Sequence, residues 1–107
     1  YVFDLLSIYS VKIDNSDGEK KEKNLRNYLF LSEEIIDEIG KAKFTQIVYS
    51  DEYRRLKEAN QIVFDLVDRA NENELAKSTA EANYERYLKK IELQSKFFDT
   101  KISEVKL

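Results

Sequence analysis

The segment LKEANQIVFDLVDRA, residues 56–70, carries apolar residues in the rhythm of an α-helix. With the residues just before it, the segment forms a stripe that advances by three and four positions: Tyr53, Leu56, Asn60, Val63, Val67 and Ala70. This spacing is typical of a helix that packs its seam against another helix. One polar residue, Asn60, lies in the middle of the stripe, and Asp68 lies beside its end. The segment therefore predicts an all-α fold and raises the question of what Asn60 does there.

Three further stretches have a helical spacing of apolar residues. Residues 2–13 are the first, although a strand is the alternative for so short a segment with several β-branched residues. Residues 19–39 form a second heptad seam, and Gly40 follows where a left-handed C-cap is expected. A last helix is expected to start within residues 75–78. Its predicted seam comprises Ala80, Tyr84, Tyr87, Ile91, Gln94, Phe98 and Val105, and only the step from Phe98 to Val105 departs from the spacing.

The segments between these helices contain turn residues or lack helical spacing. NSDGE, residues 15–19, is rich in residues that tolerate a bent backbone. KAKFTQIVY, residues 41–49, has no helical spacing and is expected to be a connection that is partly extended. Ser50 is placed to cap the helix that follows it, since Asp51 and Glu52 favour the positive end of a helix.

The length of the chain and of its helices limits the architecture. A chain of 107 residues forms a single domain, residues 1–107. Helices of about 20 residues span about 30 Å, and short turns make them fold back antiparallel. We therefore expect an antiparallel helical hairpin or a three- or four-helix bundle with coiled-coil-like packing. So small a core gives little excess stability, which favours a homodimer whose interface includes the helix of residues 56–70.

The composition excludes several classes of function. The chain has no cysteine and no histidine, which removes thiol nucleophiles, zinc–thiolate sites and imidazole-based triads. Only two glycines occur, so a glycine-rich phosphate loop is absent. The net charge is −3 and no arm is strongly basic, which argues against a nucleic-acid partner. No apolar run reaches the roughly 20 residues of a membrane span and no signal peptide is evident, so we expect a cytoplasmic protein without a membrane partner.

Asn60 has two interpretations. A lone asparagine in a helix seam fixes the register and the number of the helices that pack together. Alternatively, Asn60 belongs to a buried polar group that binds a small ligand or a partner protein, since buried polar groups need hydrogen-bond partners. Several polar residues lie beside the apolar stripes of the predicted helices and not inside runs of charge. With Asn60 they form the candidate ligand site: Asp4, Lys12, Asn60, Asp68, Asn83 and Arg86.

Two acidic segments offer an alternative function, a magnesium site. EEIID, residues 33–37, and DLVD, residues 65–68, place acids at helical spacing, and Mg²⁺ prefers such oxygen ligands. The spacing resembles the E-E-x-x-E and E-x-x-D motifs of all-helical nucleotide pyrophosphohydrolases of the MazG and dimeric dUTPase type, with Asp37 and Asp65 in place of glutamates. The resemblance implies a magnesium-dependent hydrolase, whereas an ordinary solvated helix face has the same spacing. The ligands in this alternative are Glu33, Glu34, Asp37, Asp65 and Asp68.

Several segments resemble a family of small uncharacterised all-helical bacterial and phage proteins. DLLSIYSVK, residues 4–12, is similar to the family signature D-K-L-(S/T)-I-L-E-I-K. LKEANQIVFDLVD, residues 56–68, resembles L-x-x-V-N-x-x-L-W-x-I-E-D, and NYERYLK, residues 83–89, resembles N-D-x-R-x-x-L-K. KNLRNYL, residues 23–29, and SEVK, residues 103–106, are similar to shorter motifs of the same family. In bacteria the family is often encoded near surface-polysaccharide genes.

The resemblance implies a candidate site but no reaction. Phe64 stands where the family has tryptophan, Val67 where it has the first acid of an E-D pair, and Tyr84 where it has aspartate. The loss of two acids weakens a metal-dependent interpretation. The residues that carry over are the six of the candidate ligand site. The chain begins at Tyr1 and not at a methionine, which leaves its completeness at that end open.

The sequence thus leads to three hypotheses of function. The first is a non-enzymatic helical module that self-associates and binds a small ligand or a partner protein through the polar residues around Asn60. The second is a magnesium-dependent nucleotide hydrolase. The third is a phage or surface-polysaccharide accessory protein with a structural role.

Overall fold

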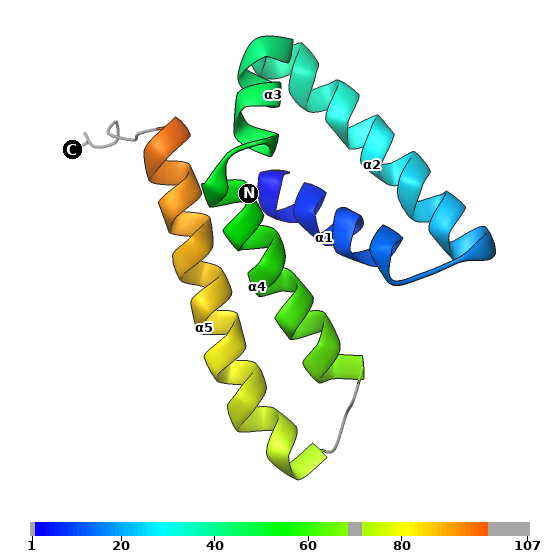
Figure 1. Cartoon of the computed structure of the whole chain (residues 1–107), viewed down its shortest axis with the longest axis vertical. Coiled ribbons are helices and arrows are strands. Elements are labelled where there is room, and N and C mark those ends of the chain that lie inside the picture. The colour runs from blue at the N-terminus through cyan, green and yellow to red at the C-terminus, as the bar shows by residue number, and fades with distance from the viewer. Residues whose placement is uncertain (1, 69–71, 99–107) are drawn as a thin grey trace.

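The computed structural model describes residues 2–68 and 72–98, with side chains for residues 2–67 and 79–98. Within these residues the chain forms five helices and no strand (Figure 1). The helices are α1 (Val2–Asp14), α2 (Gly18–Ile39), α3 (Lys41–Val48), α4 (Asp51–Asp68) and α5 (Glu72–Phe97). The all-α bundle predicted from the sequence is confirmed, and the alternative of a strand near the N-terminus is wrong.

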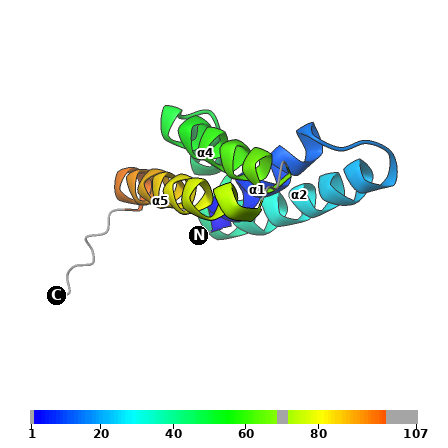
Figure 2. The ribbon, with the colours of Figure 1, turned by 90° about the horizontal axis from the view of Figure 1, so that it is seen from below.

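The helices are arranged in an open, flat layer with α1 near its centre. α1 packs against both α2 and α4, and α5 packs against α4. Figure 1 shows α5 and α2 at opposite edges, with α1 and α4 between them, and Figure 2 shows α4 raised above α5. The molecule measures 42 × 35 × 20 Å, and its shortest dimension is about two helix diameters. One consequence is that α2 and α5 each have a long face that no other described helix covers.

Two of the expected helix boundaries are confirmed, although the left-handed cap expected at Gly40 is not. The Oγ atom of Ser50 accepts a hydrogen bond from the backbone N–H of Tyr53 at 3.1 Å, which makes Ser50 the N-cap of α4. Gly40 ends α2, and its N–H donates to the carbonyl oxygen of Ile36 at 2.8 Å. The φ of Gly40 is +90° with ψ 153°, a region that only glycine enters without strain. Its φ is positive as expected, but its ψ is more extended than in a left-handed cap.

The prediction that residues 41–49 form a partly extended connection is wrong, because residues 41–48 form α3. This helix has only eight residues, about two turns, so its sequence is too short to display a helical period. What holds it is packing: Ile47 is fully buried, and the Phe44 ring lies 6.1 Å from that of Phe3. The last helix also begins earlier than expected, at Glu72.

All five helices contribute to one hydrophobic core. Its buried members are Phe3, Leu6, Ile35, Ile47, Tyr53, Leu56 and Leu93. The Phe3 ring is central, with the Tyr53 ring edge-on at 6.3 Å and the Phe98 ring at 6.0 Å. Such aromatic pairs add to the stabilisation that comes from buried area. No helix among the described residues is both long enough and apolar enough to cross a membrane.

Candidate functional site

Beside this core, a buried carboxylate collects polar side chains from three helices. Asp4 lies in the first turn of α1, and only 4% of its surface is exposed. Asn60 on α4 is buried as well, at 5% exposed. The remaining partners come from the inward face of α5 and from the next turn of α1. We call this group the Asp4 cluster; it consists of Asp4, Ser7, Asn60, Asn83, Arg86 and Lys90.

Two cations from α5 neutralise the Asp4 carboxylate. Arg86 donates from Nη2 to Oδ2 at 2.8 Å and from Nε to Oδ1 at 3.4 Å, so that both carboxylate oxygens are engaged. The Nζ atom of Lys90 lies 3.8 Å from Oδ2. Asn83 fixes the guanidinium from its other side, because its Oδ1 accepts a hydrogen bond from Nη1 at 3.2 Å. A fork of this kind is among the stronger polar contacts in proteins.

Asn60 connects the same carboxylate to α4. Its Nδ2 donates to Oδ1 of Asp4 at 3.1 Å and to Oγ of Ser7 at 2.7 Å. The Ser7 hydroxyl in turn donates to the backbone carbonyl of Asp4 at 2.8 Å. The amide therefore uses both of its N–H donors on α1, which explains why an asparagine sits in the seam of α4.

The surroundings of Asp4 have opposing effects on its pKa. Burial raises the pKa of Asp4, but the hydrogen bonds from Arg86 and Asn60 and the charges of Arg86 and Lys90 outweigh that effect. The net result is a pKa below the ordinary value of an aspartate. Asp4 is therefore ionised at neutral pH, as a carboxylate paired with two cations should be.

This shift predicts how the stability depends on pH. Because the pKa of Asp4 is lower in the folded than in the unfolded state, its contribution is fully present above the unfolded value of about 3.9 and is lost as the pH falls through the folded value. We expect the free energy of unfolding of the wild type to approach that of Asp4→Asn as the pH falls below about 4. Urea denaturation of both proteins between neutral and acid pH measures this difference. A constant difference over the whole range would contradict the assignment.

The cluster agrees in large part with the candidate site predicted from the sequence. Asp4, Asn60, Asn83 and Arg86 meet as expected. Lys12 does not join them: it is exposed, and it lies eight residues, or about 12 Å, further along α1. The side chain of Asp68 lies outside the described residues. Ser7 and Lys90 were not predicted, although their spacings of three from Asp4 and four from Arg86 place them on the same helix faces.

The geometry of the Asp4 cluster favours a structural task. Its side chains form their hydrogen bonds with one another. The two hollows beside it are small, with volumes of about 210 Å³ next to Asn60 and Arg86 and about 200 Å³ next to Asp4 and Lys90. Pockets for small molecules are usually about 300–1,000 Å³ in size. The cluster thus joins α1, α4 and α5 at one point.

The acids of the magnesium alternative do not gather in the described part of the chain. Glu33, Glu34 and Asp37 are exposed on α2, while Asp65 lies on α4 and accepts a hydrogen bond from Gln61 at 2.9 Å. Among the residues described, no three acids come close enough together to hold a metal ion. The physical reason is the position of α1, which packs between α2 and α4 (Figure 1). The side chain of Asp68, the fifth proposed ligand, is not described.

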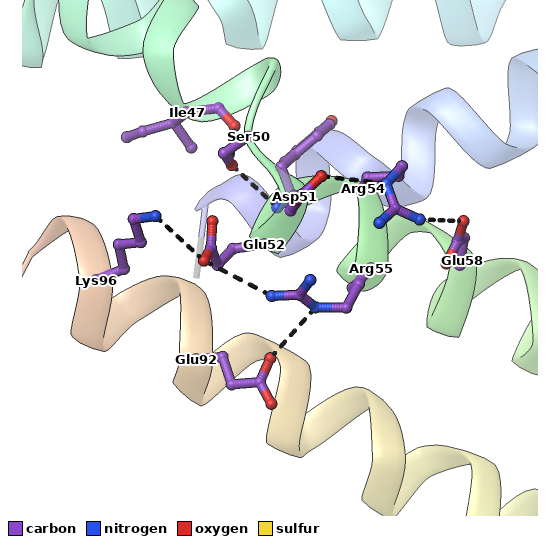
Figure 3. Close-up of polar contacts among 10 residues, drawn as sticks. Ile47, Ser50, Asp51, Glu52, Arg54, Arg55, Glu58, Glu92 and Lys96 are labelled. Carbon is purple, nitrogen blue, oxygen red and sulfur yellow. Dashed lines mark hydrogen bonds and ion pairs between the residues drawn. The ribbon is translucent and has the colours of Figure 1, made fainter.

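A second polar network, which the sequence did not predict, joins α4 and α5 near the opposite end of the hairpin (Figure 3). Oε2 of Glu52 lies 3.3 Å from Nζ of Lys96 and 3.6 Å from Nη2 of Arg55. Arg55 also reaches Glu92 on α5, with 3.7 Å between Nε and Oε1. Ion pairs near the surface contribute little to stability. They fix the register of α5 on α4 and show no chemistry of their own.

No family model, no curated protein and no solved structure matches this chain. The similarity to the small bacterial and phage family therefore rests on the quoted motifs alone and stays a prediction.

Proposed function

We propose that this chain is a non-enzymatic helical module that pairs with a second copy of itself through the outward face of α5. The observation that carries the proposal is an apolar stripe on that face. Tyr84, Tyr87 and Ile91 are 60%, 54% and 46% exposed, and they follow one another at spacings of three and four. Ala80 and Gln94, both exposed, extend the stripe in each direction.

This stripe is the part of the predicted seam of the last helix that faces away from the core, whereas Phe98, the next member of that seam, packs against Phe3. The inward face of α5 is formed by a different set of residues, among them Ala82, Arg86 and Leu93. A single apolar side chain on a surface is ordinary. A row of large ones at 3–4 spacing is the pattern into which another helix inserts its own side chains. The Tyr84 and Tyr87 rings already stack, with centroids 6.4 Å apart.

Most of the charges beside the stripe are already paired within the chain, so its apolar side chains are what a partner helix would contact. Arg86 and Lys90 pair with Asp4, and Glu92 pairs with Arg55 and Lys89. α5 also lies at an edge of the molecule, so no other described helix obstructs the approach (Figures 1 and 2).

The proposal shifts the expected dimer interface from α4 to α5. The first half of the α4 seam, Tyr53, Leu56 and Asn60, is already buried within a single chain. In this proposal the Asp4 cluster has a structural role. It holds the inward face of α5 against α1 and α4, which keeps the stripe turned outward.

The experiment is sedimentation of the wild type and of the double variant Tyr87→Glu/Ile91→Glu from low micromolar to millimolar concentration. We expect a concentration-dependent dimer for the wild type and a monomer for the double variant, because each glutamate buries a charge without a partner in the interface. The control is Leu29→Glu/Phe30→Glu, which changes exposed apolar residues on α2 to the same extent. A wild type that stays monomeric, or a control that dissociates as the test variant does, would contradict the proposal.

A further inference from the structure

A wide hollow lies between α1 and α2, away from both polar networks. Its volume is about 800 Å³, and the last turns of α1, the turn that follows and the first half of α2 form its walls. Three lysines line it: Lys12 from α1, and Lys20 and Lys23 from α2. We call it the lysine hollow. Lys12, which does not reach the Asp4 cluster, thus has a place in a second site.

The positive charge of the lysine hollow is not balanced by its surroundings. None of the three lysines forms an ion pair in the described part of the chain, whereas Lys57, Lys89, Lys90 and Lys96 do. Asp17 is the one acid among the residues that line the hollow. The chain as a whole has a net charge of −3, but these three unpaired cations create a positive potential around the hollow. A bound anion would neutralise that charge.

Of the other donors in the lysine hollow, some have a hydrogen-bond partner among the described residues and some do not. Asn15, Ser16 and Asn24 each donate to a helix carbonyl of their own chain segment, and Asn15 also donates to Oε1 of Gln61 on α4 at 2.8 Å. The side chains of Tyr9 and Asn27, which also line the hollow, make no hydrogen bond to a described residue. α2 begins at the same place, and the Asp17 side chain does not cap it, so the amides of its first turn add positive potential.

The lysine hollow also has an aromatic side. Tyr9 from α1 and Phe64 from α4 line it together with the lysines, and its size suits a small molecule and not a lone ion. Cations and free amide donors suit phosphate groups, and aromatic rings suit a flat heterocycle. We propose that the lysine hollow binds a phosphate-bearing small molecule of the nucleotide class, with the phosphates at Lys12, Lys20 and Lys23 and the ring beside Tyr9 and Phe64. The hollow does not involve α5, so this proposal and the pairing of two copies stand independently.

The test is titration of the full chain with ATP, without divalent metal, followed by calorimetry and by the amide shifts of ¹⁵N-labelled protein. We expect saturable binding by the wild type and a loss of affinity of about tenfold or more in Lys12→Glu/Lys20→Glu. The matched control is Lys21→Glu/Lys41→Glu, because both lysines are exposed, neither lines the hollow, and the net charge changes equally. The control should keep wild-type affinity within about threefold.

Two further probes separate the phosphates from the ring. ATP is expected to bind more tightly than tripolyphosphate or adenosine alone, and the shifted amides are expected around Lys12, Lys20 and Phe64. Equal affinity for tripolyphosphate and ATP would overturn the assignment of the aromatic side. No binding of ATP at millimolar concentration, or an equal loss of affinity in the control, would overturn the site as a whole.

Discussion

Replacing Asp4 by alanine is expected to lower the free energy of unfolding by about 3 kcal/mol. The substitution leaves Arg86 and one donor of Asn60 without their acceptor in a buried place. The loss stays at the lower end of the range for broken buried pairs, because the side chains of Arg86 and Lys90 are 28% and 36% exposed and keep access to water. Urea denaturation at neutral pH measures the change.

Asp14→Ala is the matched control for Asp4→Ala. Asp14 lies on the same helix and pairs with Lys57 at 2.8 Å, but its side chain is 55% exposed, so its loss should cost less than about 1 kcal/mol. The double variant Asp4→Ala/Arg86→Ala should lose less than the sum of the two single changes, because removing both partners leaves no unpaired charge. Equal effects of Asp4→Ala and Asp14→Ala would show that the Asp4 cluster does not fasten the helices.

Replacing Leu56 by alanine is expected to lower the free energy of unfolding by about 2–5 kcal/mol. Leu56 is fully buried in the core to which all five helices contribute, so the shorter side chain loses its contacts and leaves a cavity. Denaturation by urea, with circular dichroism at the same time, gives the loss and reports whether the remaining helix content is native.

Leu29→Ala is the comparison for Leu56→Ala, since the deleted atoms are the same and Leu29 is 53% exposed on α2. It should change the free energy of unfolding by no more than about 0.5 kcal/mol. If the two alanine variants were equally stable, Leu56 would not be buried in the core between α4 and its neighbouring helices.

Much of the fold could be predicted because the helix-forming segments are long enough to show their period. The stripe through Leu56 and Asn60, the cap at Ser50 and the stop at Gly40 all depend on local chemistry, and all were found in the sequence. α3 was missed because two turns contain too few apolar positions to define a face. Its helical state depends on the burial of Ile47 against other helices, which no local pattern expresses.

The direction of an apolar face is harder to predict than its existence. α5 has two such faces, and the one with the clearer heptad spacing, Tyr84 to Ile91, points outward. The inward face is harder to recognise because it includes Arg86 and Lys90, whose charges are satisfied only by Asp4 from the other end of the chain. The spacing of apolar residues shows that a helix has an apolar face. Which face is buried depends on helices that are remote in sequence.

The sequence also predicts most, but not all, of the residues that form the Asp4 cluster. Asp4, Asn60, Asn83 and Arg86 border apolar stripes, and each could satisfy a buried group on another helix, so their meeting could be anticipated. Lys12 borders a stripe in the same way, yet α1 turns it toward α2. The difference between the two sides of α1 arises from the packing of α1 between α2 and α4, which spacing along one helix cannot indicate.

The bond from Arg86 to Asp4 spans 82 positions of the chain and ties α1 to α5. During synthesis, α1 leaves the ribosome long before its counter-charge has been made. Until α5 has been made, the Asp4 carboxylate lacks the two cations that offset the cost of its burial, so the packing of α1 against α4 is less favourable. The native packing of α1 can therefore be completed only once α5 has been made, and a product that stops short of α5 would leave α1 and α4 open to proteolysis.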